Sequence, residues 1–206
     1  MHDLYEFCPA IQERVRNGLL VYDLNFTLFA GTAEWNVDLV LGAPALGAEA
    51  DEAAIPCAPP STVQIAIEIK SVMTEHRKAV KNRKRDLEAH HEHVHNYNDS
   101  AIAGGVLVIN AASTFRSPLR PEATAHKNVD RLVQHCIDEF RAVSVRGGKA
   151  GYGLDSKCAI VLKMDNINPS ATSFLGKPPA PQIGDPIHYD SFIRTICDLY
   201  SRRFPA

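Results

Sequence analysis

Apolar and polar residues change their period several times along the chain, and each change predicts a new element. From Leu4 to about Asn17 the apolar residues recur at helical spacing, and Gly18 follows as a stop signal. From Leu20 to Phe29 apolar and polar residues alternate, which predicts a half-buried strand. A turn at 30–32 and a second apolar run over Trp35–Leu41 complete a predicted hairpin.

The middle of the chain contains a loop, a strand and a long helix. Residues 42–60 are rich in Ala, Pro and acids without a clear period, which predicts a long surface loop. Thr62–Lys70 has apolar residues on one face and Gln64 and Glu68 on the other, which predicts a third strand. Thr74–Tyr97 repeats an apolar residue at every seventh position, which predicts a helix with a mostly exposed surface.

The second half predicts two further strands and two further helices. We expect a buried strand at 106–110 after two glycines, a helix at about 123–143, a loop at 147–153, a strand at 158–164, a Pro-rich arm at 169–186 and a helix at 191–203. This order predicts an α/β fold whose central mixed sheet of about five strands is flanked by helices. The length of 206 residues suits a single domain, with a core at about 4–145 and a C-terminal strand, arm and helix at 155–206.

The composition and net charge argue against several classes of protein. A net charge of −2 argues against coating nucleic acid by bulk electrostatics, so any such contact needs a local basic patch. No apolar run approaches a membrane span, and the acidic N-terminal segment lacks the apolar core of a signal peptide. The five cysteines are far apart and odd in number, which argues against a zinc ribbon or a disulfide framework. We therefore expect a cytoplasmic protein.

The candidate chemistry lies on the predicted second and third strands. Glu68 and Lys70 are two residues apart on one strand, so their side chains leave the same face. An acid and a lysine on an otherwise apolar strand are costly unless they serve each other or a ligand. If the 35–41 strand lies alongside, Asp38 reaches the same place, and two carboxylates suit Mg²⁺. An ordinary salt bridge between Glu68 and Lys70 at a sheet edge is the alternative.

The pattern Val37-Asp38 followed by Glu68-Ile69-Lys70, within this order of elements, resembles the PD-(D/E)xK nuclease superfamily. The resemblance covers about residues 4–145, with Val37 in place of the proline of the motif. It implies a restriction-endonuclease-like core in which Asp38 and Glu68 bind Mg²⁺, with Mn²⁺ as a substitute, and Lys70 is the catalytic lysine. It also implies a site glutamate on the first helix, for which Glu13 is the candidate and Glu6 the alternative.

A basic stretch follows directly after the candidate lysine. Residues 76–85 contain six Lys or Arg, which predicts a surface that contacts phosphates. A solvated helix face is the alternative. The residues expected to bind DNA are Arg77, Lys78, Lys81, Lys84 and Arg85, together with Gln64 on the face of Glu68.

Four histidines crowd residues 90–95. His91 and His95 are one helical turn apart and could bind zinc or another transition metal. The HExxH pattern is missing and no cysteine lies near in sequence, so we favour a structural role or a polar patch beside the groove. The sequence contains no Gly-x-Ser-x-Gly and no P-loop, so it does not support a serine hydrolase or a nucleotide hydrolase.

Taken together, these patterns predict a Mg²⁺-dependent endonuclease that cuts double-stranded DNA, of the type II restriction or phage-defence kind. One domain offers one active site, so cutting both strands predicts a homodimer, with residues 42–60 or 169–186 as recognition or dimer contacts. The alternatives are a DNA-repair nuclease, a non-catalytic nucleic-acid-binding module with a nuclease-like fold, and a His-rich metal-binding protein.

Overall fold

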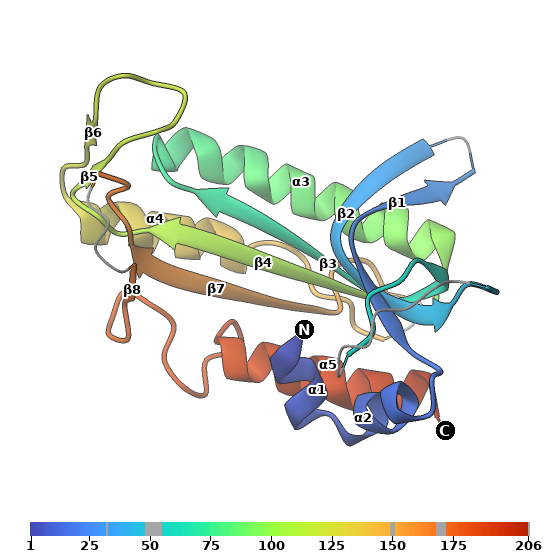
Figure 1. Cartoon of the computed structure of the whole chain (residues 1–206). Coiled ribbons are helices and arrows are strands. Elements are labelled where there is room, and N and C mark those ends of the chain that lie inside the picture. Colours follow the sequence, from blue (N-terminus) through green and yellow to red (C-terminus); the bar gives the residue numbers. More distant parts are fainter. Residues whose placement is uncertain (32, 48–54, 149–150, 168–171, 206) are drawn as a thin grey trace.

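A mixed sheet of six strands, in the order β1-β2-β3-β4-β7-β8, forms the centre of the protein (Figure 1). The computed structural model describes residues 1–31, 33–47, 55–148, 151–167 and 172–205. The strands of this sheet are β1 (Val21–Ala30), β2 (Ala33–Pro44), β3 (Pro60–Val72), β4 (Ile102–Asn110), β7 (Ser156–Lys163) and β8 (Ser173–Phe174). A short pair, β5 (Thr114–Phe115) and β6 (Thr124–Ala125), forms a second sheet.

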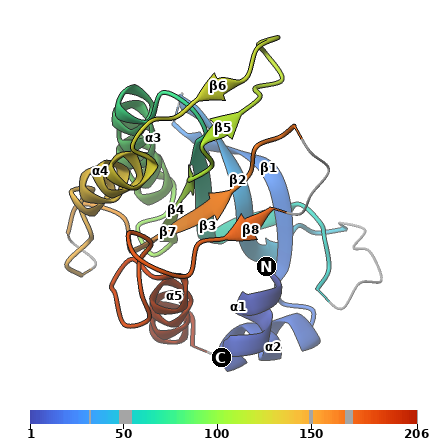
Figure 2. The same ribbon diagram turned by 90° about the vertical axis from the view of Figure 1, so that its left-hand side faces the viewer.

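Two groups of helices cover the two faces of the large sheet. The helices are α1 (His2–Phe7), α2 (Pro9–Arg16), α3 (His76–Tyr97), α4 (Val129–Arg141) and α5 (Tyr189–Arg203). Helices α3 and α4 lie on one face, and α1, α2 and α5 on the other (Figures 1 and 2). Each face has its own buried cluster of apolar side chains, with Ala66 in the cluster under α3 and Ile67 in the cluster under α5. The α/β class and the flanking helices are therefore confirmed, with six strands where about five were expected.

The direction of the strands changes at β3. Strands β1, β2 and β3 are antiparallel neighbours, whereas β3, β4 and β7 are parallel. A hairpin can join antiparallel strands, but a parallel pair needs a crossover. Helix α3 makes that connection from β3 to β4, and α4 lies between β4 and β7 in the chain. Strand β3 therefore has an antiparallel neighbour, β2, on one side and a parallel neighbour, β4, on the other.

Several predicted boundaries were wrong, each for a local reason. The first helix is two helices, because Cys8 is extended and Pro9 begins α2, where its missing N–H is not needed. The helix expected from about 123 begins only at Val129, and β6 precedes it. Strand β4 begins at Ile102, so Gly104 and Gly105 lie inside it. A Cβ on Gly105 would come within 2.6 Å of a Leu154 methyl group, which explains why this position is a glycine.

The predicted loop at 42–60 is shorter than expected, because β2 continues to Pro44 and β3 begins at Pro60. Residues 48–54 of this loop, 149–150 of the loop at 147–153 and 168–171 near the Pro-rich arm lie outside the described residues. All five cysteines are free thiols. Among the described residues, no helix combines the length and the apolar character needed to cross a membrane.

A buried carboxylate, Asp155, joins elements from both layers. Its side chain accepts hydrogen bonds from the backbone N–H of Ala103 at 2.8 Å and from His95 Nε2 of α3 at 3.0 Å, and it forms an ion pair with Arg203 of α5. Burial alone would raise the pKa of Asp155, but the bonds from His95 and Arg203 outweigh it and hold the pKa below its ordinary value. Asp155 is thus a charged link between α3, β4 and α5.

We predict that Asp155→Asn lowers the free energy of unfolding by about 3 kcal/mol, because the substitution leaves Arg203 without its buried partner. The difference should be full above about pH 4. It should shrink as the pH falls below 3.8, the ordinary aspartate pKa that applies to the unfolded chain, and vanish once the pH passes the lower pKa of folded Asp155. Urea unfolding of both proteins at several pH values measures this difference in the free energy of unfolding. Asp190→Asn, which removes an exposed ion pair with Arg194, is the control and should cost less than about 1 kcal/mol. Equal losses in the two variants would contradict the prediction.

Candidate active site

Strands β2 and β3 separate beside Asp38. Their pairing runs from Pro44 and Pro60 to Leu39 and Ile67, and no later pair is formed by the described residues. This register places Asp38 across from Glu68. The Asp38 carboxylate accepts a hydrogen bond from the backbone N–H of Ile69 at 2.6 Å, where a continuing strand would supply a carbonyl. Asp38 therefore marks a fork between the two strands.

The hairpin of β1 and β2 explains the fork, because its end packs against α3 instead of following β3. The ring of Trp35 stacks on the ring of His93, with 4.6 Å between centroids and 15° between planes. Val37 is fully buried and belongs to the apolar cluster on the α3 face. Figure 1 shows the hairpin rising beside α3.

The side chains of Glu68 and Lys70 project from β3 on the face of the sheet that α3 covers. Glu68 is only 2% exposed, and its Oε1 forms an ion pair with Lys70 Nζ. The Lys70 side chain is 21% exposed. The structure therefore places Asp38 on β2 across from Glu68, and Lys70 two residues further along β3.

His90 is a fourth polar residue at this place, and sequence reasoning did not connect it with Glu68. It is fully buried, and its Nε2 lies 3.3 Å from the carbonyl oxygen of Ala66. A carbonyl only accepts, so Nε2 carries the hydrogen. Burial lowers the pKa of His90 to about 3, so the ring is neutral and Nδ1 has a free lone pair. Nδ1 lies 3.9 Å from Glu68 Oε2, and neither atom has a hydrogen-bond partner among the described residues.

A polar hollow of about 380 Å³ lies beside the end of β3. Its lining includes Ser71, Thr74, Lys78, Asn82 and Arg83. Arg83 Nε donates to the carbonyl oxygen of Ser71 at 3.3 Å, and its Nη1 donates to Asp86 at 2.8 Å. Sequence reasoning did not single out Arg83 among the six cations, although it lies three residues after Val80 and four before Leu87, two buried residues of α3.

The residues predicted to bind DNA are spread around α3. Of the five cations named, only Lys78 lines the hollow. Arg77, Lys81 and Arg85 are exposed elsewhere on the helix, and Lys84 is half-buried. Among these five cations, Lys78 alone therefore lies at the hollow beside the end of β3.

Two predicted site residues lie on the wrong face of the sheet. Gln64 was expected beside Glu68, but the register shifts between Leu41–Ile65 and Gly42–Val63 and leaves Gln64 in a bulge. Its Oε1 accepts a hydrogen bond of 2.7 Å from the hydroxyl of Tyr200 on α5, on the opposite face.

Glu13 does not join the other site residues either. It is exposed on α2, and α2 covers the face of the sheet opposite α3. Glu6, the alternative, is exposed on α1 in the same layer. The structure therefore brings no first-helix glutamate to Glu68.

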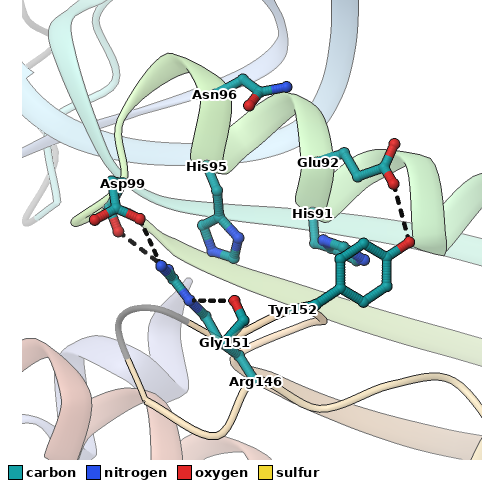
Figure 3. Close-up of a pocket in the computed structure, with 8 residues that line it drawn as sticks. All are labelled: His91, Glu92, His95, Asn96, Asp99, Arg146, Gly151 and Tyr152. Atoms are coloured by element: carbon teal, nitrogen blue, oxygen red, sulfur yellow. Dashed lines mark hydrogen bonds and ion pairs between the residues drawn. The ribbon is translucent and has the colours of Figure 1, made fainter.

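The histidine cluster is divided among four environments. His90 faces Glu68, His93 stacks on Trp35, His95 bonds to Asp155, and His91 meets the ring of Tyr152 edge-on at 4.3 Å. The rings of His91 and His95 are 6.0 Å apart. They line a pocket of about 490 Å³ in which Tyr152 donates to Glu92 and Arg146 pairs with Asp99 (Figure 3). The polar side chains of this pocket are largely engaged with one another.

No set of three or more His, Cys, Asp or Glu side chains in the described part of the chain is arranged to hold a metal ion. Comparisons with protein families, with curated proteins and with solved structures each find no match to this chain.

Proposed function

We propose that the protein is a divalent-metal-dependent nuclease that hydrolyses phosphodiester bonds in double-stranded DNA. The observation that carries the proposal is the position of Asp38 across from Glu68 at the fork of β2 and β3, with Lys70 paired to Glu68 on the same strand. The order of α1 and α2, three strands, α3 and β4 also agrees with the core expected from the resemblance to the PD-(D/E)xK nucleases.

The donors at the fork fit a hard cation such as Mg²⁺. Asp38 and Glu68 offer carboxylate oxygens, which Mg²⁺ prefers, and it commonly takes only one or two carboxylates together with water and substrate phosphate. Glu68 supports the fit directly, because its Oε2 is buried without a hydrogen-bond partner. Keeping a buried carboxylate oxygen unpaired is costly unless a cation satisfies it in the working state.

Each residue at the fork has its own role in the proposed reaction. When bound, Mg²⁺ polarises the phosphate and lowers the pKa of a coordinated water. Asp38 and Glu68 bind and orient the cation. Lys70 is held by Glu68 Oε1, and its ammonium orients the attacking water and offsets the charge that develops on the phosphate oxygens.

The hollow beside β3 offers a place for the DNA backbone. Lys78 and Arg83 of α3 supply positive charge, and Ser71, Thr74 and Asn82 supply hydrogen-bond donors. Each chain contributes one site, so cutting both strands requires two chains, and we propose a homodimer. A restriction or phage-defence role is the biological setting that we propose.

We predict that Asp38→Asn and Lys70→Ala each lower the rate of Mg²⁺-dependent plasmid cleavage by about 100-fold or more. Asp38→Asn is the cleaner variant, because its amide oxygen can still accept from the Ile69 N–H while the charge is lost. Lys70→Ala leaves buried Glu68 unpaired, at a cost of about 3 kcal/mol, so thermal unfolding is measured in parallel.

Lys177→Ala is the control, because Lys177 is exposed in the segment after β8, at the other edge of the sheet. Cleavage that is unchanged in folded Asp38→Asn would refute the proposed function. DNA binding without cleavage by the wild-type protein, with any divalent cation, would favour the non-catalytic binding module instead.

We predict a separate effect on DNA binding at the hollow. Lys78→Gln should weaken binding of a short duplex at every sequence and lower the slope of log Kd against log salt by about 1, because one phosphate contact is lost. Lys81→Gln, one turn along the same helix but outside the hollow, should change the slope less. Fluorescence anisotropy at several salt concentrations measures both. Identical behaviour of the two variants would contradict this path for the backbone.

A further inference from the structure

Glu68 and His90 turn two buried polar atoms toward each other. Glu68 Oε2 is the carboxylate oxygen that Lys70 does not contact, and His90 Nδ1 is the ring nitrogen opposite the one that bonds to the Ala66 carbonyl. The two atoms are 3.9 Å apart, and neither has a hydrogen-bond partner in the part of the chain that the structure describes. Burying two polar atoms without partners is costly, and a cation bound by both would remove that cost.

We propose that His90 is a metal ligand, so that the cation bound by Glu68 takes one nitrogen donor and the site prefers Mn²⁺ to Mg²⁺. This inference rests on the proposed function, because it assumes that Glu68 binds a divalent cation. A cation about 2.1 Å from each donor spans up to about 4.2 Å between them, and the observed 3.9 Å lies within that reach.

The surroundings of His90 hold it in the form that a metal needs. The carbonyl of Ala66, on β3, fixes the hydrogen on Nε2 and thereby leaves Nδ1 as the donor. Metal-bound histidines commonly have their second ring nitrogen bonded in this way. Ala66 is two residues before Glu68, so the same strand supplies one ligand and orients the other.

The nitrogen donor decides which cation is preferred. Imidazole is a good ligand for transition metals, whereas Mg²⁺ favours oxygen. Mn²⁺ accepts both kinds of donor. His90 therefore strengthens the binding of Mn²⁺, whereas it strengthens the binding of Mg²⁺ little.

The test measures cation binding directly in the purified protein with MnCl₂, by the EPR signal of free Mn²⁺, and with MgCl₂ by competition. His90→Gln is the main variant, since its amide N–H can keep the bond to Ala66 while the nitrogen donor is lost. His91→Gln is the matched control, because His91 is the neighbouring buried histidine and faces Tyr152 instead of Glu68.

We expect His90→Gln to weaken Mn²⁺ binding by about tenfold or more while Mg²⁺ binding changes by less than about threefold. His91→Gln should change neither.

A second measurement does not depend on any variant folding. Pulsed EPR of the wild-type protein loaded with Mn²⁺ should show modulation from a directly bound ¹⁴N nucleus, and His91→Gln should keep it. Absence of that modulation would overturn the inference.

The remaining outcomes separate this inference from the proposed function. If the wild-type protein binds neither Mn²⁺ nor Mg²⁺, the proposed function fails and this inference fails with it. If the wild-type protein binds Mn²⁺ and folded His90→Gln binds it equally well, only the inference fails, and a water donating to both acceptors accounts for the pair. Equal losses of Mn²⁺ and Mg²⁺ in His90→Gln would refute the selectivity.

Discussion

The separation of β2 from β3 is the constraint on which the candidate site depends. Because Trp35 and Val37 pack against α3, the part of β2 before Leu39 stays paired with β1 but not with β3, and the Asp38 carboxylate accepts the hydrogen bond of the Ile69 N–H. If β2 instead continued along β3, the ladder would cover the segment that Glu68 and Lys70 occupy. The packing of an aromatic ring on a helix thus determines where charged side chains can meet at the middle of a sheet.

Two buried carboxylates in this protein differ in how fully they are satisfied. Asp155 receives a backbone N–H, a histidine and an arginine, and it links three elements of the fold. Glu68 receives Lys70 on one oxygen, while the other oxygen faces the lone pair of His90. A fully satisfied buried network makes a structure rigid, whereas a half-satisfied one is costly unless a ligand completes it. This contrast is the physical reason for treating Asp155 as structural and Glu68 as functional.

The sequence was informative where a period of two or 3.6 residues decides the outcome. Alternation identified β1 and β3, an apolar run identified β2, and alternation correctly placed Glu68 and Lys70 on one face. It failed for Gln64, because one inserted residue in a bulge reverses the face and leaves no mark in the pattern. Glu13 was misplaced because the periodicity of a helix shows which side is buried, but not which face of a sheet that helix covers. His90 was hidden among four histidines whose different partners depend on long-range packing.

The fork also leaves an edge of β3 without a strand beside it from Glu68 to Val72, among the described residues, and Ile69 there is 46% exposed. Such an edge is a ready template for a strand from another molecule and hence for aggregation. Charged side chains, above all lysine, are the usual protection, and here Lys70 stands on the open segment while the Asp38 carboxylate already occupies the Ile69 N–H. The charges to which we assign phosphate chemistry thus also protect this edge against the addition of a strand from a neighbouring chain.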